Sequence, residues 1–275
     1  MIWMTDMMIG FLIFLLAIAV LFVFAVLGRS GHKGLDALRG WYYAHRGLHD
    51  ENKPENSMSA FRAALDNGYG IELDIHLLSD GNLAVIHDSL LKRTTGAEGR
   101  IEDLSTEDLV KYHLEGTSET IPTFREVLEL YQGKAPLIVE LKPERGNHAL
   151  LCKAACDMLD EYDVVYCVES FDPRCIYWLR KNRPNVIRGQ LTENYFKSGS
   201  KLPAVLKFLL ANQLENFLVL PDFVAYRFAD RNNLSNWLVR KFWGVQGVTW
   251  TIRKKDDFDT AVQEGYLPIF ENFEP

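Results

Sequence analysis

Residues 70–87 have the sequence GIELDIHLLSDGNLAVIH, in which two apolar runs flank a short polar stretch. The runs, Gly70–Ile75 and Leu83–His87, have the aliphatic and β-branched composition of strands. Only seven residues separate them, whereas a crossover to a parallel strand needs about a dozen or more. Asp80-Gly81 in that gap is typical of a hairpin turn. We therefore expect Leu83–His87 to return antiparallel to the strand before it.

Strand-like and helical segments alternate through the rest of the chain. The other strand-like runs are Tyr42–Ala44, Leu137–Leu141, Val164–Val168, Val186–Gln190, Phe217–Leu220, Gln246–Trp250 and Leu267–Phe270. The helical periods are Ser57–Asn67, Thr123–Tyr131, His148–Asp160, Pro173–Lys181, Pro203–Ala211, Leu234–Lys241 and Lys255–Glu264. Such alternation predicts a parallel sheet with crossover helices. Eight such strands in roughly 250 residues predict an α/β fold of the (β/α)8 TIM-barrel type.

The composition of the 275-residue chain excludes several classes of protein. It is 48% hydrophobic and 24% charged, as expected of a folded protein and not of a disordered one. The net charge is −7 and there is no basic run, so we expect no nucleic-acid partner. Four cysteines in a chain of this length do not predict a disulfide framework.

An uncharged segment at residues 7–28, MMIGFLIFLLAIAVLFVFAVLG, is long enough to span a bilayer as one helix. A cleaved signal peptide is the alternative, but no Lys or Arg precedes the segment and no A-x-A site follows it. Arg29, Lys33 and Arg39 come after it, so the positive-inside rule predicts a single-pass membrane protein with its remaining chain in the cytoplasm.

The rest of the chain is expected to form one domain. We assign residues 29–40 to a juxtamembrane linker and residues 41–275 to the barrel. Residues 88–122 are longer than a barrel loop requires and predict a small insertion, with a short helix at Ser105–Tyr112.

Acidic residues interrupt two of the predicted strands near their carboxyl ends, where barrel enzymes place their chemistry. Strand periodicity puts Glu72 and Asp74 on one face, and Glu140 and Lys142 on one face of another strand. Three converging carboxylates would repel one another without a cation, and hard oxygen ligands suit Mg²⁺ or Ca²⁺. The alternative is that these acids simply pair with Lys142 and Arg46.

Two histidines, His45 and His87, end strand-like runs beside the acidic residues. An imidazole serves as acid or base near neutral pH, and Arg46 offers a bidentate fork for a phosphate. Together these groups predict a site for an anionic phosphoester. His76 is a further candidate ligand. Three neighbouring polar residues have simpler expected roles. Glu55 and Asn56 are expected to cap a helix. Asp88 is expected either to orient His87 or to cap the insertion.

Several short motifs in these segments occur together in one known family. They are His45-Arg46-Gly47, Pro54-Glu55-Asn56-Ser57, Ile71-Glu72-Leu73-Asp74, Asp80-Gly81, His87-Asp88, Leu91-x-Arg93-Thr94-Thr95-Gly96, Ile121-Pro122-Thr123 and Glu140-Leu141-Lys142. In this order they resemble the glycerophosphodiester phosphodiesterases. The resemblance is dense over residues 43–143 and thins afterwards to Ser170-Phe171, Trp250-Thr251 and Gly265.

The resemblance implies a (β/α)8 barrel that hydrolyses glycerophosphodiesters to sn-glycerol 3-phosphate and an alcohol. It implies that His45 and His87 are the acid–base pair and that Arg46 and Lys142 hold the phosphate. It also implies that three acids bind a divalent metal, Mg²⁺ or Ca²⁺: Glu72, Asp74 and Glu140. The last strand, Gly265-Tyr-Leu-Pro-Ile-Phe-Glu-Asn272, departs from the family's usual Gly-Val-Asp-Gly-like stretch.

The hypothesis for the reaction is attack of the glycerol 2-hydroxyl on phosphorus, followed by hydrolysis of the cyclic product; direct attack by water is the alternative. Two other functions remain open. A lysophospholipid or phosphoinositide substrate would favour an apolar rim, for which the candidates are Tyr195, Phe196, Phe223, Tyr226 and Phe228. An inactive membrane-bound binding module is the other, although all seven candidate site residues are present.

Overall fold

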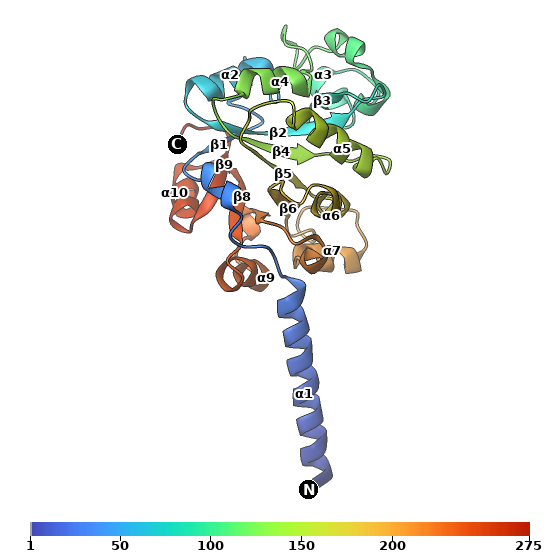
Figure 1. The fold of residues 1–275 in the computed structure, drawn as a ribbon, viewed down its shortest axis with the longest axis vertical. Helices are drawn as coiled ribbons and strands as arrows, with labels where there is room; N and C mark the ends of the chain where they lie inside the picture. Colours follow the sequence, from blue (N-terminus) through green and yellow to red (C-terminus); the bar gives the residue numbers. More distant parts are fainter. Residues whose placement is uncertain (1) are drawn as a thin grey trace.

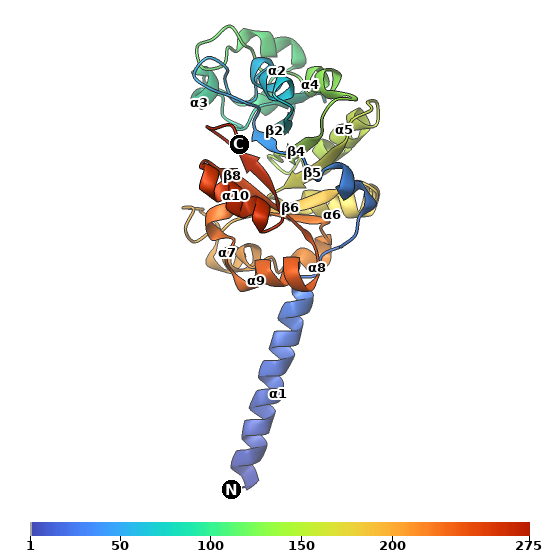
Figure 2. The same ribbon diagram turned by 90° about the vertical axis from the view of Figure 1, so that its left-hand side faces the viewer.

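The computed structural model describes residues 2–275. One long helix, α1 (Ile2–Ala25), projects from a rounded head formed by the rest of the chain (Figures 1 and 2). The most apolar 18-residue stretch within Thr5–Ala25 has a mean hydropathy of 3.1, and none of it is buried by the head. By length and composition α1 therefore suits a membrane span, a test that an uncleaved signal sequence also passes.

Eight parallel strands close into a barrel in the head. They are β1 (Tyr43–His45), β2 (Gly70–Leu77), β4 (Leu137–Leu141), β5 (Tyr166–Ser170), β6 (Arg188–Thr192), β7 (Phe223–Arg227), β8 (Gln246–Ile252) and β9 (Tyr266–Phe270). Each strand pairs with the next, and β1 closes the sheet by pairing with both β2 and β9. The predicted TIM barrel is confirmed.

Helices cover the outside of the barrel, where the apolar alternate residues of the strands face them. The longer ones are α2 (Met58–Asp66), α4 (Phe124–Tyr131), α5 (His148–Leu159), α6 (Pro173–Asn182), α7 (Ala204–Ala211) and α10 (Lys255–Gln263). Side chains cap the first turns of α2 and α4, where Ser57 accepts from the Ala60 N–H and Thr123 forms a capping box with Glu126.

The segment after β2 folds back as the sequence predicts. Strand β3 (Leu83–Val85) pairs antiparallel with β2, so it lies outside the closed barrel. The chain then forms α3 (Lys92–Thr95) and the 3₁₀ turns η2 (Ile101–Asp103) and η3 (Thr106–Lys111). A small apolar cluster of its own holds this insertion together, and it stands at the end of the head opposite α1 (Figure 1).

One predicted strand is wrong and two are displaced. Phe217–Leu220 is not a strand, because most of it lies in the short helix α8 (Asn216–Val219), which Leu220 caps just before a proline. The strand is Phe223–Arg227, whose aromatic and β-branched residues are buried. β5 and β6 each begin two residues later than predicted.

The amino-terminal end of the barrel is closed by apolar side chains. The 3₁₀ turn η1 (Lys33–Ala37) places Leu35 and Leu38 against inward-facing strand residues such as Tyr43 and Phe223. This end therefore has no room for a substrate, and the open end is the one where the strands finish.

Helix α1 is fastened to the head at its last turn. It ends at Ala25, three residues before the predicted end of the apolar segment, and Val26 is completely buried against the head. Arg29 then forms a two-pronged ion pair with Asp222, and its backbone N–H donates to the Pro221 carbonyl. Pro221 and Asp222 precede β7, so α1 joins the head at the amino-terminal side of that strand.

Candidate active site

Three buried carboxylates meet inside the open end of the barrel. Asp74 on β2 lies directly beside Glu140 on β4 in the strand register, and Glu72 precedes Asp74 on the same inward face. One oxygen from each lies within 4.8 Å of the others. None of the three is more than 6% exposed, so the site concentrates negative charge away from water.

Two basic side chains contact this cluster. Lys142 Nζ lies 2.7 Å from Glu140 Oε1 and 3.0 Å from Asp74 Oδ1. Arg46 Nε lies 3.3 Å from Asp74 Oδ2, and its Nη1 donates to Glu55 Oε1 at 2.9 Å. The residues predicted to hold a phosphate are therefore beside the residues predicted to bind a metal.

His45 ends β1 next to the cluster. Its Nδ1 lies 2.9 Å from Glu271 Oε2, and its Nε2 lies 3.8 Å from Glu72 Oε2. Burial lowers the pKa of His45 to about 4, so the imidazole is neutral at pH 7. With Nδ1–H donated to Glu271, the lone pair of Nε2 faces the carboxylates.

His87 is held in the same way from the opposite side. Its Nδ1 lies 2.6 Å from Asp88 Oδ1, and Arg93 in turn pairs with Asp88 and with Glu55. Burial also lowers the pKa of His87. The sequence left two roles open for Asp88, orientation of His87 or capping of the insertion. In the structure its carboxylate contacts His87. Each histidine thus has one nitrogen fixed by a carboxylate and the other directed into the site.

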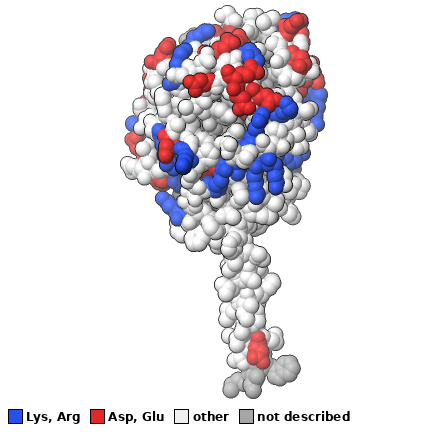
Figure 3. All heavy atoms as spheres, viewed as in Figure 1, with Lys and Arg blue, Asp and Glu red and all other residues white. Residues whose placement is uncertain are grey.

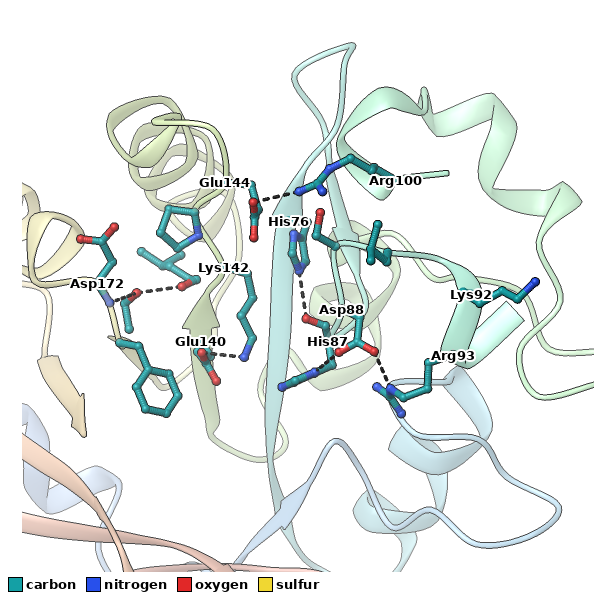
Figure 4. A pocket seen from close by; sticks show the side chains of 16 residues that line it. His76, His87, Asp88, Lys92, Arg93, Arg100, Glu140, Lys142, Glu144 and Asp172 are labelled. Atoms are coloured by element: carbon teal, nitrogen blue, oxygen red, sulfur yellow. Dashed lines mark hydrogen bonds and ion pairs between the residues drawn. The ribbon is translucent and has the colours of Figure 1, made fainter. Parts of the chain in front are cut away.

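These residues line a cavity that opens into a wider groove. The inner cavity, of about 200 Å³, is lined by His45, Arg46, Glu72, His87 and Glu140 together with residues of the later strands. The outer groove, of about 770 Å³, shares His87 and Glu140 with it. Figure 4 shows Glu140 and Lys142 on one side of this groove and His87 with Asp88 on the other. All seven site residues predicted from the sequence are therefore brought together.

The site holds more acidic than basic groups. Four buried acids, Glu72, Asp74, Glu140 and Glu169, lie near the two cations Arg46 and Lys142. Burial and neighbouring carboxylates raise the pKa of Glu72 well above its usual range, and burial raises that of Glu140 to about 7.

Asp74 behaves differently because cations surround it. Burial alone would raise its pKa, but Lys142, His87 and Arg46 outweigh that effect and hold the pKa well below its usual range. An oxygen-rich site in which carboxyl groups outnumber cations is chemically suited to a hard divalent cation.

Comparison with known proteins agrees with this site. The model of the glycerophosphoryl diester phosphodiesterase family matches residues 45–273. The chain belongs to this family. A glycerophosphodiester phosphodiesterase of Caldanaerobacter subterraneus subsp. tengcongensis is 31% identical over 236 residues, covering 81% of this chain and 89% of the relative. Glycerophosphodiester phosphodiesterase 1 of Mus musculus is 31% identical over 252 residues, covering 78% and 72%.

Solved structures of glycerophosphodiester phosphodiesterases have the same fold. A phosphodiesterase of Oleispira antarctica, in complex with the product sn-glycerol 3-phosphate, superposes with a TM-score of 0.69 at 21% identity over 88% of this chain and 95% of that chain. A structure from Silicibacter pomeroyi gives 0.70 at 19% identity over 88% and 95%. The chain is accordingly a phosphodiesterase of the glycerophosphodiester class, and the expectation of an enzyme is confirmed.

Some residues at the site of this glycerophosphodiester phosphodiesterase were missed or given another task. Glu55 and Asn56 do not cap α2, since Ser57 does; Glu55 joins Arg46 to Arg93, and Asn56 Nδ2 donates to Asp74 Oδ2 at 2.9 Å. His76 lies outside the carboxylate group, because its Nδ1 contacts Glu102 Oε1 at 2.7 Å.

Two acids of the later strands also went unpredicted. Glu271, just after β9, holds His45, although nothing in its sequence context indicates that task. Glu169 lies directly beside Glu140 in the pairing of β4 with β5 and is 1% exposed. A strand ending at Val168, as predicted, left Glu169 in a loop, and the two-residue displacement of β5 is what brings it into the barrel.

Proposed function

We propose that this chain hydrolyses glycerophosphodiesters to sn-glycerol 3-phosphate and an alcohol in a reaction that requires a divalent metal and the two histidines. The observation that carries the proposal is the group at the inner cavity: three converging carboxylates, two cations that contact them, and two carboxylate-bound histidines that line the cavity. The product bound to the Oleispira antarctica phosphodiesterase supports this substrate class.

Glu72, Asp74 and Glu140 are the proposed metal ligands. A bound Mg²⁺ or Ca²⁺ would supply Lewis-acid stabilisation of the negative charge on the phosphoryl oxygens. The positive charge of the cation would also hold Glu72 and Glu140 ionised despite their burial.

Arg46 and Lys142 are proposed to hold the phosphate. Both already contact the carboxylate cluster, so a phosphate bound by their N–H groups would lie beside the metal ligands. Asn56 and Glu55 keep Asp74 and Arg46 in position through the bonds described above. His45 and His87 line the same cavity, so the phosphorus atom is proposed to lie between them.

One histidine accepts the proton of the attacking glycerol 2-hydroxyl and the other donates a proton to the departing alcohol. The Nδ1 atoms are occupied by Glu271 and Asp88, so the Nε2 atoms perform these transfers. Opening of the cyclic product by water repeats the two transfers in reverse.

Lysophospholipids are a second candidate substrate class. A lysophospholipase D of Rattus norvegicus is 31% identical over 134 residues, covering 44% of this chain and 41% of that protein. The apolar rim expected for such a substrate is mostly wrong, because Phe223, Tyr226 and Tyr195 are buried in the fold and Phe228 is half-buried. Of these five aromatic residues Phe196 is the exposed one, so the mouth of the barrel suits glycerophosphodiesters better than lysophospholipids.

A panel of substrates tests both candidates. Glycerophosphocholine, glycerophosphoethanolamine, glycerophosphoglycerol and lysophosphatidylcholine would be incubated with the full chain, with and without chelator. Release of glycerol 3-phosphate from the first three, lost with chelator and regained with Mg²⁺ or Ca²⁺, is the expected result. The Glu140→Gln variant serves as the negative control, and turnover in excess chelator would remove the metal from the proposal.

We further propose that α1 anchors the enzyme in the cell membrane with the barrel in the cytoplasm. Lys and Arg follow α1 and none precede it. Val26 and Arg29, just after α1, contact the head, and these contacts favour a helix that stays attached to the barrel. Protease added to intact cells should leave the barrel whole, and cleavage beyond residue 40 would reverse the orientation.

A further inference from the structure

A group of exposed apolar side chains surrounds the point where α1 meets the head. Helix α8 and the helix α9 (Leu234–Trp237) lie at the end of the head from which α1 projects (Figure 2). Five side chains of α8, of α9 and of the turn that continues α9 are between 49% and 64% exposed: Phe217, Leu218, Leu234, Trp237 and Phe242. We call these five residues the basal face.

The backbone of the segment after α9 directs the side chains of Trp237 and Phe242 outward. The turn after α9, η5 (Leu238–Phe242), is π-helical, and the Trp243 N–H donates to the Leu238 carbonyl five residues earlier. One π turn therefore separates Trp237 from Phe242, which puts both on the exposed side. Leu238 and Val239, between them, are buried.

The basal face is continuous with α1. The indole N–H of Trp243 donates to the Val23 carbonyl at 2.9 Å, and its ring centroid lies 6.0 Å from that of Phe24 and 5.0 Å from that of Phe242. An unbroken row of aromatic rings thus runs from the last turns of an exposed apolar helix onto the surface of the head. Any bilayer that receives α1 reaches this row.

Basic residues lie beside the basal face, and acidic residues gather elsewhere. Arg180 donates to the carbonyls of Phe217 and Leu218, which places it against α8, and Lys241 lies within η5. Figure 3 shows uncharged surface around the root of α1, Lys and Arg next to it, and the densest group of Asp and Glu toward the opposite end.

We propose that the basal face docks onto the bilayer that holds α1, with Trp237 and Phe242 at the boundary between headgroups and acyl chains. Tryptophan is favoured at that depth, and Arg180 and Lys241 would then face anionic phospholipid headgroups. The proposal rests on the proposed anchorage of α1. Docking at this side, near the amino-terminal end of β7, leaves the carboxyl-terminal mouth of the barrel open to substrate.

Depth-dependent fluorescence quenching tests the docking on the full chain. Single cysteines replace Trp237 or Phe242, and a third variant, Val110→Cys, provides a matched control that is 66% exposed in η3 at the far end of the head. Phe11→Cys in α1 reports insertion of the helix. The four native cysteines are buried, so an environment-sensitive dye labels the introduced ones. The vesicles contain phosphatidylcholine, phosphatidylglycerol and doxyl-labelled lipid.

Quenching at positions 11, 237 and 242, with none at 110, is the expected result. Quenching at 237 and 242 should also weaken when phosphatidylcholine replaces phosphatidylglycerol, because the basic residues lose their partners. Quenching at 11 alone would overturn the docking while leaving the anchorage intact. No quenching at any position would overturn the anchorage and the docking together. Unchanged phosphodiesterase activity of the labelled variants verifies that they are folded.

Discussion

The first and second halves of the barrel contribute differently to the molecule. All seven residues predicted to perform the chemistry lie on or directly after β1, β2, β3 and β4. The half from β5 to β9 holds α1 and the basal face, and it contributes six of the residues that line the inner cavity: Glu169, Phe171, Leu191, Glu193, Trp250 and Ile269. Because β1, β2 and β4 are adjacent in the closed sheet and β3 pairs with β2, four neighbouring strands bring all seven predicted residues together.

The contrast teaches that reactive and supporting residues obey different constraints. The residues proposed to act on one phosphorus atom come from neighbouring strands. The second half adds two acids to this group, Glu271 on His45 and Glu169 beside Glu140. Substitutions in matched positions of the two halves therefore test whether the division is real.

Removal of a proposed metal ligand in the first half should have the largest effect. We expect Glu72→Gln, Asp74→Asn and Glu140→Gln each to lower kcat/KM by roughly 10⁴-fold, since a bound cation contributes several kcal/mol of transition-state stabilisation. Steady-state kinetics with glycerophosphocholine provides the measurement, and isothermal calorimetry with Mg²⁺ or Ca²⁺ should show weakened binding. Full metal affinity in all three variants would contradict the assignment.

Removal of either histidine should lower the reaction rate by about 10³-fold, which is within the range that acid–base catalysis contributes. With a nitrophenyl leaving group, which departs without protonation, the variant lacking the general acid should recover most of that loss. The variant lacking the base should remain slow with both substrates, because it cannot activate the nucleophile. The assay thus assigns the roles of His45 and His87, and equal losses on both substrates would show that the two do not divide the work.

The same division explains how much could be predicted from sequence. Strand periodicity placed Glu72 and Asp74 inward, and the hairpin signal at Asp80-Gly81 removed β3 from the barrel count. Such signals are local. Glu271 contacts a residue 226 positions away, and no local pattern encodes that bond. β7 was misplaced because the apolar run of α8 resembles a strand until packing and the following proline decide.

Glu271 tests the contribution of the second half to the chemistry. We expect Glu271→Gln to lower kcat by roughly 10- to 100-fold, because His45 loses the carboxylate that orients its ring and fixes its tautomer. Asp88→Asn is the matched change on His87 in the first half. Similar losses of kcat in both variants would show that the two histidines depend equally on their carboxylate partners. An unchanged kcat in Glu271→Gln would confine the chemistry to the first half.

Glu271 should also make folding sensitive to acid. Burial would raise its pKa, but donation from His45 and the charge of Arg253 outweigh burial and lower the pKa to about 2. Because the folded pKa is below the usual value, ionised Glu271 stabilises the fold at neutral pH, and that stability is lost as the pH falls toward 2. Thermal unfolding should show Glu271→Gln less stable by on the order of 2 kcal/mol at pH 7, with the difference shrinking below about pH 4.

Glu169 gives the smallest expected effect and the sharpest control for the metal site. Glu169 lies beside Glu140 in the strand register, and both are buried carboxylates. It stands outside the group of three whose oxygens converge, and its Oε2 has no hydrogen-bond partner among the described residues. Burial and the nearby Glu140 raise its pKa well above the usual range, so a neutral amide of the same shape replaces it closely. We expect Glu169→Gln to change kcat/KM by less than about threefold, under roughly 0.7 kcal/mol. Measured beside Glu140→Gln with the same substrate and metal, a loss as large as that of its neighbour would make Glu169 a fourth ligand and extend the reactive group into the second half of the barrel.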